Sequence, residues 1–447
     1  MKRDTIVALA SGPGRAGVAV IRLSGPQAGP TLAALTERDL PKPRRAARRA
    51  FCHPGTELSL DDGIAIWFPG PRSFTGEDVA ELHIHGGPAV IAAIVEACLT
   101  QPGLRFADPG EYTRRAFENG KLDLAEAEGL ADLVDAETEA QRRQALRQRR
   151  GALSSVYEAW RARLIEAAAL IEAEIDFPDE DLPGALARRA GPILQALASE
   201  MAAHLDDAHR GERIRDGYRI AIIGPPNAGK SSLLNALAQR EAAIVSDIPG
   251  TTRDVVEVRL VLAGFPVWIA DTAGLREAAD AIEAEGVRRA LARAEEADLR
   301  IGVVELGAEI PPSLKSALGP GDVLARSKAD LGPALPPAPT GTADEPAAIR
   351  VSAKTGVGLG GLEALLARYV ADALGREEAP VLTRARHRRL VEEAHAALLR
   401  AIPVLDQGAE LAAEDLRAAS AAIGRLTGRI DVEDLLEEIF SSFCIGK

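Results

Sequence analysis

The 447-residue sequence lacks the features of secreted, membrane-spanning or nucleic-acid-coating proteins. Its three cysteines, Cys52, Cys98 and Cys444, are odd in number and far apart, so they give neither a disulfide framework nor a zinc spacing. No apolar run reaches membrane-spanning length, and the first ten residues lack the apolar core of a signal peptide. The net charge of −13 excludes a protein that simply coats nucleic acid, because that needs clustered cations. We therefore expect a cytoplasmic protein.

Aromatic residues are also scarce, at 4%, whereas residues that favour helices are common. A chain of this length exceeds one hydrophobic core, so we expect several domains. Residues 1–118 combine short apolar runs, bounded by Gly and Pro, with a helical pattern over Pro88–Leu99, which predicts an α+β domain. Residues 119–216 and 376–447 share a helical texture. The different texture of 217–375 predicts an α/β domain inserted into a helical one.

The most specific motif begins the inserted segment. Arg219–Ile223 is a short apolar run with the length of a buried strand, and it leads into GPPNAGKS at 224–231. A strand, a G-x-x-x-x-G-K-[ST] loop and a helix form a P-loop, where backbone N–H groups and the helix N-terminus hold phosphate. Lys230 is expected to reach the outer phosphates, and Ser231 to place its hydroxyl on Mg²⁺.

Two further segments extend the predicted phosphate site. The segment 271–274 (DTAG) follows the strand-like Val267–Ala270, where an aspartate holds Mg²⁺ and a glycine senses the γ-phosphate. Thr251 and Thr252 lie between this segment and the P-loop, and they are candidate switch threonines. The order of these motifs makes each more specific than it is alone.

The residues that recognise the base indicate GTP rather than ATP. Lys328-Ala329-Asp330 resembles the NKxD motif, in which the aspartate accepts hydrogen bonds from guanine; the alternative is a solvated surface lysine and aspartate. Ser352-Ala353-Lys354 resembles the supporting loop. Ser327 stands where the motif has asparagine, and its shorter side chain is expected to lose one hydrogen bond, worth about 1 kcal/mol. The sequence leaves open how strongly this lowers nucleotide affinity.

Hydrolysis is expected to differ from that of Ras-type enzymes. In those enzymes a glutamine after the D-x-x-G glycine orients water, and an arginine finger stabilises the transition state. Leu275 occupies the glutamine position here, and leucine cannot orient water. The carboxylates that follow offer a replacement, and composition does not choose among them: Glu277, Asp280, Glu283 and Glu285.

These motifs resemble the tRNA uridine modification GTPases of the MnmE (TrmE) family along nearly the whole chain. The matching segments are DTIVALASGPGRAGVAVIRLSG, SFTGEDVAELHIHGGP, PGEYTRRAFENGKLDLAEAEGLADLVDA, IDFPDED, GPPNAGKSSLLNAL, IPGTTRD, DTAGLREA and FSSFCIGK. The resemblance implies an N-terminal folate-binding and dimerisation domain at 1–118. It also implies a helical domain in two parts, 119–216 and 376–447, around a P-loop G domain at 217–375.

The resemblance implies a potassium-activated GTPase whose G domains pair across a dimer, with K⁺ where an arginine finger would act. Glu283 matches the catalytic glutamate, and Thr252 joins Ser231 on Mg²⁺. The residues that match potassium ligands are Asn227, Ser246, Ile248 and Thr251; a loop-stabilising amide is the alternative for Asn227. The whole GTP site is expected to comprise Asn227, Ala228, Gly229, Lys230, Ser231, Ser232, Ser246, Asp247, Ile248, Pro249, Gly250, Thr251, Thr252, Asp271, Thr272, Ala273, Gly274, Ser327, Lys328, Ala329, Asp330, Ser352, Ala353 and Lys354.

A second site is expected in the N-terminal domain. Glu81, His83 and His85 alternate with apolar residues, so they share one face of a strand. A metal site is one interpretation, but no fourth ligand is near in sequence. The resemblance favours a folate, 5-formyl- or 5,10-methylene-tetrahydrofolate, whose pterin edge pairs with a carboxylate and whose tail meets cations. The implied contacts are Arg22, Glu81, Lys121 and Lys447; taken alone, Lys121 is a surface lysine before a helix.

Other residues have two interpretations each. Cys444 is a reactive thiol near the folate or, as we favour, a small buried hydrophobe. The arginine-rich runs Arg142–Arg150 and Arg384–Arg389 contact tRNA phosphates or, as we favour, form solvated helix faces.

By resemblance, the protein forms a homodimer and a heterotetramer with a flavin-dependent subunit of the MnmG (GidA) family, which carries FAD. Together they add a carboxymethylaminomethyl or aminomethyl group to C5 of the wobble uridine of certain tRNAs, with one carbon from methylene-tetrahydrofolate. One alternative is an RNA-binding regulatory or ribosome-assembly GTPase without modification activity; another is a scaffold that only dimerises. The sequence gives neither the set of tRNAs, nor the nitrogen donor, nor the coupling of GTP hydrolysis to the modification.

Overall fold

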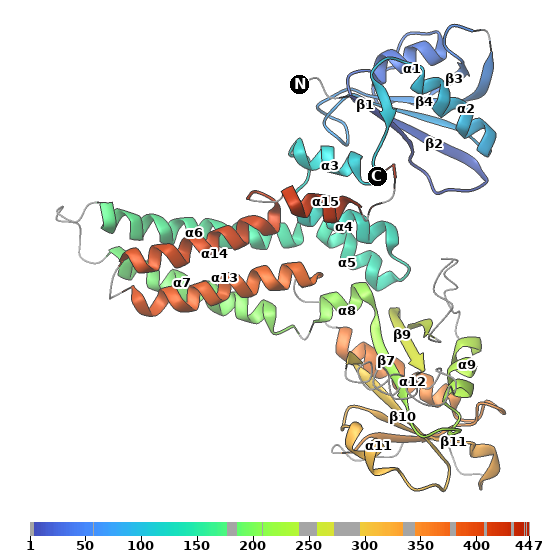
Figure 1. The fold of residues 1–447 in the computed structure, drawn as a ribbon, viewed down its shortest axis with the longest axis vertical. Helices are drawn as coiled ribbons and strands as arrows, with labels where there is room; N and C mark the ends of the chain where they lie inside the picture. Colours follow the sequence, from blue (N-terminus) through green and yellow to red (C-terminus); the bar gives the residue numbers. More distant parts are fainter. Residues whose placement is uncertain are drawn as a thin grey trace, which may run out of the picture. The chain divides into compact units, whose positions relative to one another are not determined.

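The computed structural model describes residues 4–56, 58–176, 186–207, 209–240, 257–271, 296–333, 345–375, 381–405, 409–430, 433–441, 443 and 445–446. The chain divides into two compact units. Unit 1 comprises Met1–Ala131, Arg149–Glu172 and Ala413–Lys447, and unit 2 comprises Asp132–Gln148 and Ala173–Ala412. Figure 1 labels the helices and strands in chain order.

Unit 1 contains a six-stranded sheet with the order β3-β4-β5-β2-β1-β6. Its strands are β1 (Thr5–Leu9), β2 (Ala16–Ser24), β3 (Ala47–Cys52), β4 (Ser59–Phe68), β5 (Val79–Gly86) and β6 (Leu104–Phe106). Neighbouring strands are antiparallel except β1 and β6. Helices α1 (Ala28–Thr36) and α2 (Pro88–Leu99) share a core with alternate strand residues such as Ile21 and Leu82. The predicted α+β pattern of this region is confirmed.

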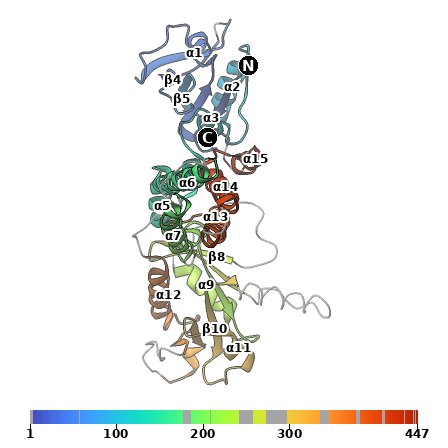
Figure 2. The ribbon, with the colours of Figure 1, turned by 90° about the vertical axis from the view of Figure 1, so that its left-hand side faces the viewer.

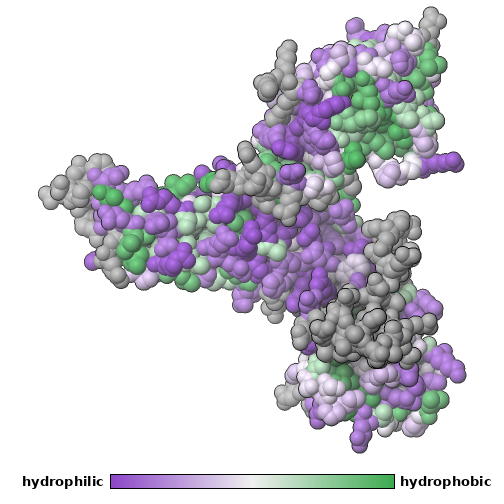
Figure 3. All heavy atoms as spheres, in the orientation of Figure 1, coloured by the Kyte–Doolittle hydropathy of each residue, from purple (hydrophilic) through white to green (hydrophobic). Residues whose placement is uncertain are grey.

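The face of this sheet opposite α1 and α2 is partly covered. Phe74 and Tyr112 form a small cluster with Ile6 of β1. Farther along the face, Val18 of β2 and Ile64 of β4 are 58% and 42% exposed. Figure 3 shows hydrophobic residues on the part of unit 1 that holds β1 to β6, α1 and α2, without separating the two faces of the sheet. Exposed apolar surface of this kind is typical of contact surfaces.

Helices complete unit 1. They are α3 (Glu111–Glu118), α15 (Glu433–Ser441) and most of α4 (Leu124–Asp135), α6 (Ala152–Asp176) and α14 (Ala409–Thr427). One apolar stripe of α6 faces inward, because Leu153, Trp160 and Leu164 are buried. Gly110, just before α3, has a φ of +66°, and a Cβ there would lie 2.6 Å from the backbone oxygen of Phe440 in α15. The C-terminal helix therefore packs directly on the start of α3.

Unit 2 contains a second six-stranded sheet with the order β12-β11-β10-β7-β9-β8. Its strands are β7 (Tyr218–Ile223), β8 (Glu257–Leu262), β9 (Phe265–Asp271), β10 (Leu299–Glu305), β11 (Val323–Ser327) and β12 (Ala347–Arg350). All pairs are parallel except β8 with β9. Helices α9 (Lys230–Arg240) and α12 (Leu359–Leu374) pack on one face and α11 (Pro312–Ala317) on the other, as Figure 2 shows for α11 and α12. This is the predicted α/β fold, in which ligands bind at the carboxyl ends of the strands.

Ion pairs join the segments that lead into and out of this sheet. The helices here are α5 (Glu139–Arg149), α7 (Leu186–Leu205), α8 (Arg210–Asp216) and α13 (Ala385–Val404). Asp132 accepts hydrogen bonds from Arg215 at 3.1 Å and Arg384 at 2.6 Å. Arg388, 8% exposed, pairs with Asp207 at 2.6 Å. The expectation of a solvated or tRNA-facing arginine run is therefore wrong for Arg384 and Arg388, because carboxylates distant in sequence hold them inside the unit.

The described elements from β7 to α12 lie within the predicted G-domain range of 217–375. Unit 2 also includes residues 132–148 and helices on both sides of that range. That residues 217–375 form a domain of their own stays a prediction, as do the other domain boundaries.

Candidate nucleotide and cofactor sites

The P-loop connects β7 to α9 in unit 2. Gly224 has a φ of +151°, and a Cβ there would lie 2.2 Å from a backbone oxygen of β10, so only glycine fits. Asn227 and Gly229 also have positive φ values, +59° and +92°. Lys230 begins α9, and its Nζ donates hydrogen bonds to the carbonyls of Gly224 at 2.9 Å and Pro225 at 2.8 Å. The loop is thus wrapped around its lysine, as a phosphate cradle requires.

Ser231 and Asp271 meet beside the P-loop. Asp271 ends β9 and pairs in register with Ile222 of β7, and Ser231 Oγ donates a hydrogen bond to its Oδ2 at 2.5 Å. Burial lowers the pKa of Lys230, an effect that the negative charge of Asp271 opposes. A hydroxyl and a carboxylate side by side are ligands that Mg²⁺ takes in nucleotide sites, so these two residues fit that ion.

The residues predicted to recognise the base lie at and beyond the ends of β11 and β12. The buried Ser327 Oγ donates a hydrogen bond to the carbonyl of Ala228 in the P-loop at 2.6 Å. Asp330 accepts a hydrogen bond from Ser352 Oγ at 2.6 Å, which lowers the pKa of Asp330 and keeps it ionised. Lys328 Nζ donates to Glu305 of β10 at 2.7 Å. An ionised aspartate held in this way is an acceptor for the N–H groups of guanine.

Arg22 is the centre of the candidate cofactor site in unit 1. Its Nε donates to Glu81 Oε1 at 3.0 Å across the β2–β5 pair. Its guanidinium carbon lies 5.8 Å from the ring centre of Phe74 and 5.7 Å from that of Tyr112. The Tyr112 hydroxyl donates to the backbone carbonyl of Arg22 at 2.6 Å. His83 Nε2 is buried without a hydrogen-bond partner, 3.4 Å from Glu81 Oε2.

The C-terminal tail reaches the same cluster. The carbonyl of Gly446 accepts a hydrogen bond from Arg22 Nη1 at 3.4 Å. Gly446 has a φ of +98°, and a Cβ there would lie 2.1 Å from the backbone oxygen of Leu9 in β1. The tail therefore lies against β1 at a point where only glycine fits. Lys121 lies beside Gly76, with its Cε 3.2 Å from the place of a Cβ on that residue.

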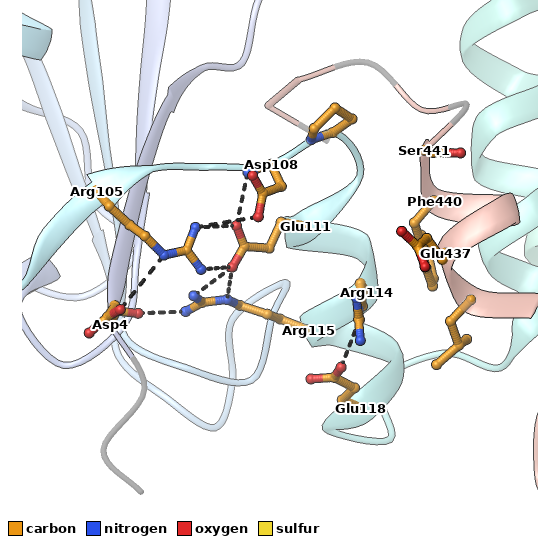
Figure 4. A pocket seen from close by; sticks show the side chains of 12 residues that line it. Asp4, Arg105, Asp108, Glu111, Arg114, Arg115, Glu118, Glu437, Phe440 and Ser441 are labelled. Atoms are coloured by element: carbon orange, nitrogen blue, oxygen red, sulfur yellow. Dashed lines mark hydrogen bonds and ion pairs between the residues drawn. The ribbon is translucent and has the colours of Figure 1, made fainter. Parts of the chain in front are cut away.

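A pocket of about 920 Å³ lies elsewhere in unit 1, between α3, the end of β6 and α15 (Figure 4). Its arginines face carboxylates: Glu111 pairs with Arg105 at 2.6 Å and with Arg115 at 2.8 Å. Burial raises the pKa of Glu111, but hydrogen bonds from Arg105, from the backbone of Asp108 and from Arg115 lower it to about 2. None of the predicted folate contacts lines this pocket. We infer that the ion pairs that line this pocket hold α3, the helix that carries Tyr112, in place.

Comparison with known proteins shows which family the chain resembles. A family model described as the GTP-binding protein TrmE N-terminus matches residues 5–121, and one described as the MnmE helical domain matches residues 124–444. The tRNA modification GTPase MnmE of Parvibaculum lavamentivorans is 60% identical over 99% of this chain and 100% of its own length. The chain belongs to the MnmE family of tRNA modification GTPases.

Other MnmE proteins are similar to this chain over nearly its full length. That of Maricaulis maris is 57% identical over 99% of this chain and 99% of its own length. Among solved structures, the G domain of the T. maritima FeoB iron transporter covers 34% of this chain and 98% of its own, with 23% identity and a TM-score of 0.25. A score this low bears on neither fold nor function. None of the described helices is long and apolar enough to cross a membrane.

In this MnmE-family chain, the structure brings together a large part of each predicted site. The P-loop residues 227–232 lie near Asp271 and Ser327, and Arg22 contacts Glu81. The remaining predicted residues lie outside the described parts of the chain: Ser246, Asp247, Ile248, Pro249, Gly250, Thr251, Thr252, Thr272, Ala273, Gly274, Leu275, Glu277, Asp280, Glu283, Glu285, Cys444 and Lys447. Their roles stay predictions. Across the described residues, no group of three His, Cys, Asp or Glu side chains is arranged to hold a metal ion, so Glu81, His83 and His85 form no such group.

The sequence did not point to several side chains that contact residues of the candidate sites. Phe74 and Tyr112 flank Arg22, and Glu305 holds Lys328. Tyr112 lies within a quoted family segment, but nothing in its local pattern links it to Arg22, 90 residues earlier. Only a three-dimensional arrangement reveals such partners.

Proposed function

We propose that this MnmE-family GTPase hydrolyses GTP with the help of Mg²⁺ and K⁺ and uses a folate in the modification of wobble uridines. The main support is that one edge of the second sheet carries Lys230, the Ser231–Asp271 pair and Asp330 together. Phosphate, magnesium and guanine would each find a suitable partner there. The modification is addition of a carboxymethylaminomethyl or aminomethyl group to C5 of the wobble uridine.

In the proposed hydrolysis, Ser231 and Thr252 hold Mg²⁺, and Asp271 supports it. Asn227 is exposed, has a left-handed backbone, and its amide makes no hydrogen bond within the described part of the chain, which suits a ligand for K⁺. We propose that K⁺ supplies positive charge to the developing transition state and that Glu283 orients water. The other proposed potassium ligands are Ser246, Ile248 and Thr251.

For the folate, we propose that Glu81 accepts hydrogen bonds from the pterin edge and that Arg22, Lys121 and Lys447 meet its anionic tail. The aromatic rings beside Arg22 support this, as does His83 Nε2, which makes no hydrogen bond in the described part of the chain, because a flat, polar heterocycle needs both apolar walls and hydrogen-bond partners. A bound folate supplies the one carbon that the modification needs.

We propose further that two copies pair and that a flavin-dependent subunit of the MnmG family, carrying FAD, joins them on tRNA in the cytoplasm. The exposed Val18 and Ile64 on the open sheet face support a contact surface in unit 1.

The role of K⁺ is tested by steady-state GTP turnover measured in K⁺ and, separately, in Na⁺ at the same concentration. We expect K⁺ to raise turnover about tenfold or more, since one well-placed charge at the transition state has at least that effect. Asn227→Ala should remove most of the K⁺ effect. Asn235→Ala, which changes an exposed asparagine of α9, is the matched control and should leave the K⁺ effect intact.

Equal turnover in the two salts, or an undiminished K⁺ effect in Asn227→Ala, would contradict the potassium mechanism. A Glu283→Ala variant with intact K⁺-stimulated turnover would contradict the role of Glu283.

A further inference from the structure

Ser327 contacts the P-loop through the single hydrogen of its hydroxyl. That hydrogen is donated to the carbonyl of Ala228 at 2.6 Å, and the side chain is 5% exposed. The place of a Cβ on Gly229 lies 3.8 Å from Ser327 Cβ. Ser327 thus holds β11 against the loop that receives phosphate. A hydroxyl has one hydrogen to donate, so none is left for a ligand.

The hydroxyl hydrogen of Ser352, the second serine of the base site, is also used within the protein. Ser352 Oγ donates its hydrogen to Asp330 at 2.6 Å and accepts one from the backbone N–H of Thr355 at 3.2 Å. Asp330 is an acceptor and serves only the N–H groups of a base. Guanine, however, also has an edge that offers two acceptors, N7 and O6, and reading that edge takes donors.

We propose that Ser327 is a positioning residue for the P-loop and donates no hydrogen bond to guanine N7, so that the site selects guanine by the edge that faces Asp330. An asparagine at this position would have two amide hydrogens, one for the Ala228 carbonyl and one for N7. The hydrogen bond lost with serine is therefore the one to the base, while the one to the P-loop is kept. The inference rests on the proposed GTP site.

Displacement of a fluorescent GDP from the full-length protein by GDP and by 7-deaza-GDP tests this. The analogue carries carbon in place of N7 and is otherwise unchanged. We expect the two affinities of the wild type to agree within about twofold. Ser327→Asn should bind 7-deaza-GDP about fivefold more weakly than GDP, the factor that one neutral hydrogen bond gives. Ser327→Ala should weaken both nucleotides by a similar factor and leave their ratio at the wild-type value.

Two results would overturn the inference: a wild type that binds 7-deaza-GDP at least fivefold more weakly with the difference lost in Ser327→Ala, or a Ser327→Asn variant that does not discriminate. Thermal melting identifies a variant that fails to fold. If Ser327→Asn does not fold, the ratio of 7-deaza-GDP to GDP affinity in the wild type and in Ser327→Ala decides whether the inference holds.

Inosine diphosphate, which lacks the 2-amino group, tests the underlying site separately. It should bind about tenfold or more weakly than GDP in the wild type, because the charged acceptor Asp330 loses the hydrogen bond that the 2-amino group donates. Equal binding of inosine diphosphate and GDP would overturn the guanine site itself, whatever the 7-deaza ratio is.

Discussion

The nucleotide site of unit 2 and the Arg22 cluster of unit 1 are assembled in different ways. Lys230 and Ser231 are adjacent in sequence, and the loop that holds them also supplies the carbonyls of Gly224 and Pro225. Arg22, in contrast, bonds Glu81 59 residues away and Gly446 424 residues away. The first site depends on one short loop, whereas the second depends on three distant segments meeting. We expect the two to respond differently to substitution.

The largest effect should follow from Lys230→Met, which keeps the apolar stem of the side chain and removes its charge. GTP turnover should fall about 100-fold or more, as when one donor to a developing charge is removed. Folate binding should be unchanged, because Lys230 lies in the other unit. Turnover assays and folate titrations of the variant measure both, and Lys315→Met, an exposed residue of α11, is the matched control. Retained turnover would show that the loop does not bind phosphate.

Glu81→Gln tests the Arg22 cluster of unit 1. Tetrahydrofolate should bind about tenfold or more weakly, because the charged acceptor next to Arg22 is lost, while GTP turnover stays within about twofold of the wild type. Isothermal titration with the folate gives the affinity. Glu96→Gln, an exposed residue of α2, is the control. Unaltered folate affinity in Glu81→Gln would contradict the cofactor site.

A smaller effect is expected from Ser352→Ala. The variant removes the hydrogen bond that holds Asp330, so GDP affinity should fall about fivefold. Displacement of fluorescent GDP measures the change, and Ser316→Ala, whose hydroxyl bonds only its own helix, is the control. A change equal to that of the control would mean that Asp330 needs no support.

The smallest effect is expected on thermal stability and its pH dependence, through the ion pairs of Glu111 in α3. The pKa of Glu111 is lowered to about 2 from the ordinary 4.5, so its ion pairs stabilise the folded state fully above about pH 4.5 and are lost as the pH falls toward 2. Glu111→Gln should lower the melting temperature by a few degrees at pH 7 and lessen its fall between pH 5 and 3. Thermal melting at several pH values, with Glu96→Gln alongside, measures this. Parallel curves for wild type and Glu111→Gln would contradict it.

The same contrast explains what the sequence alone predicts. Gly224, Lys230 and Asp271 belong to motifs whose chemistry depends on local spacing, so their arrangement follows from the residue pattern. The alternation of Glu81 and His83 with apolar neighbours likewise predicts their shared face on β5.

The rest depends on contacts between distant segments. Arg384 and Arg388 resembled a solvated run, because the carboxylates that pair with them, Asp132 and Asp207, lie far away in sequence. Tyr112 and Gly446 reach Arg22 only when the chain folds. Ser327 looked like a weakness in guanine recognition, and its bond to Ala228 shows that support of the P-loop is preserved. Local pattern carries no information on such pairings.

The most direct test of the central claim is mass spectrometry of wobble uridines in tRNA from a strain that lacks the protein, complemented with the wild type, Lys230→Met or Glu81→Gln. We predict that the wild type restores the modified nucleosides, that Lys230→Met leaves the wobble uridines without them, and that Glu81→Gln lowers their level, because both sites serve one modification. Normal wobble nucleosides in the uncomplemented strain, or in the strain that carries Glu81→Gln, would contradict the account.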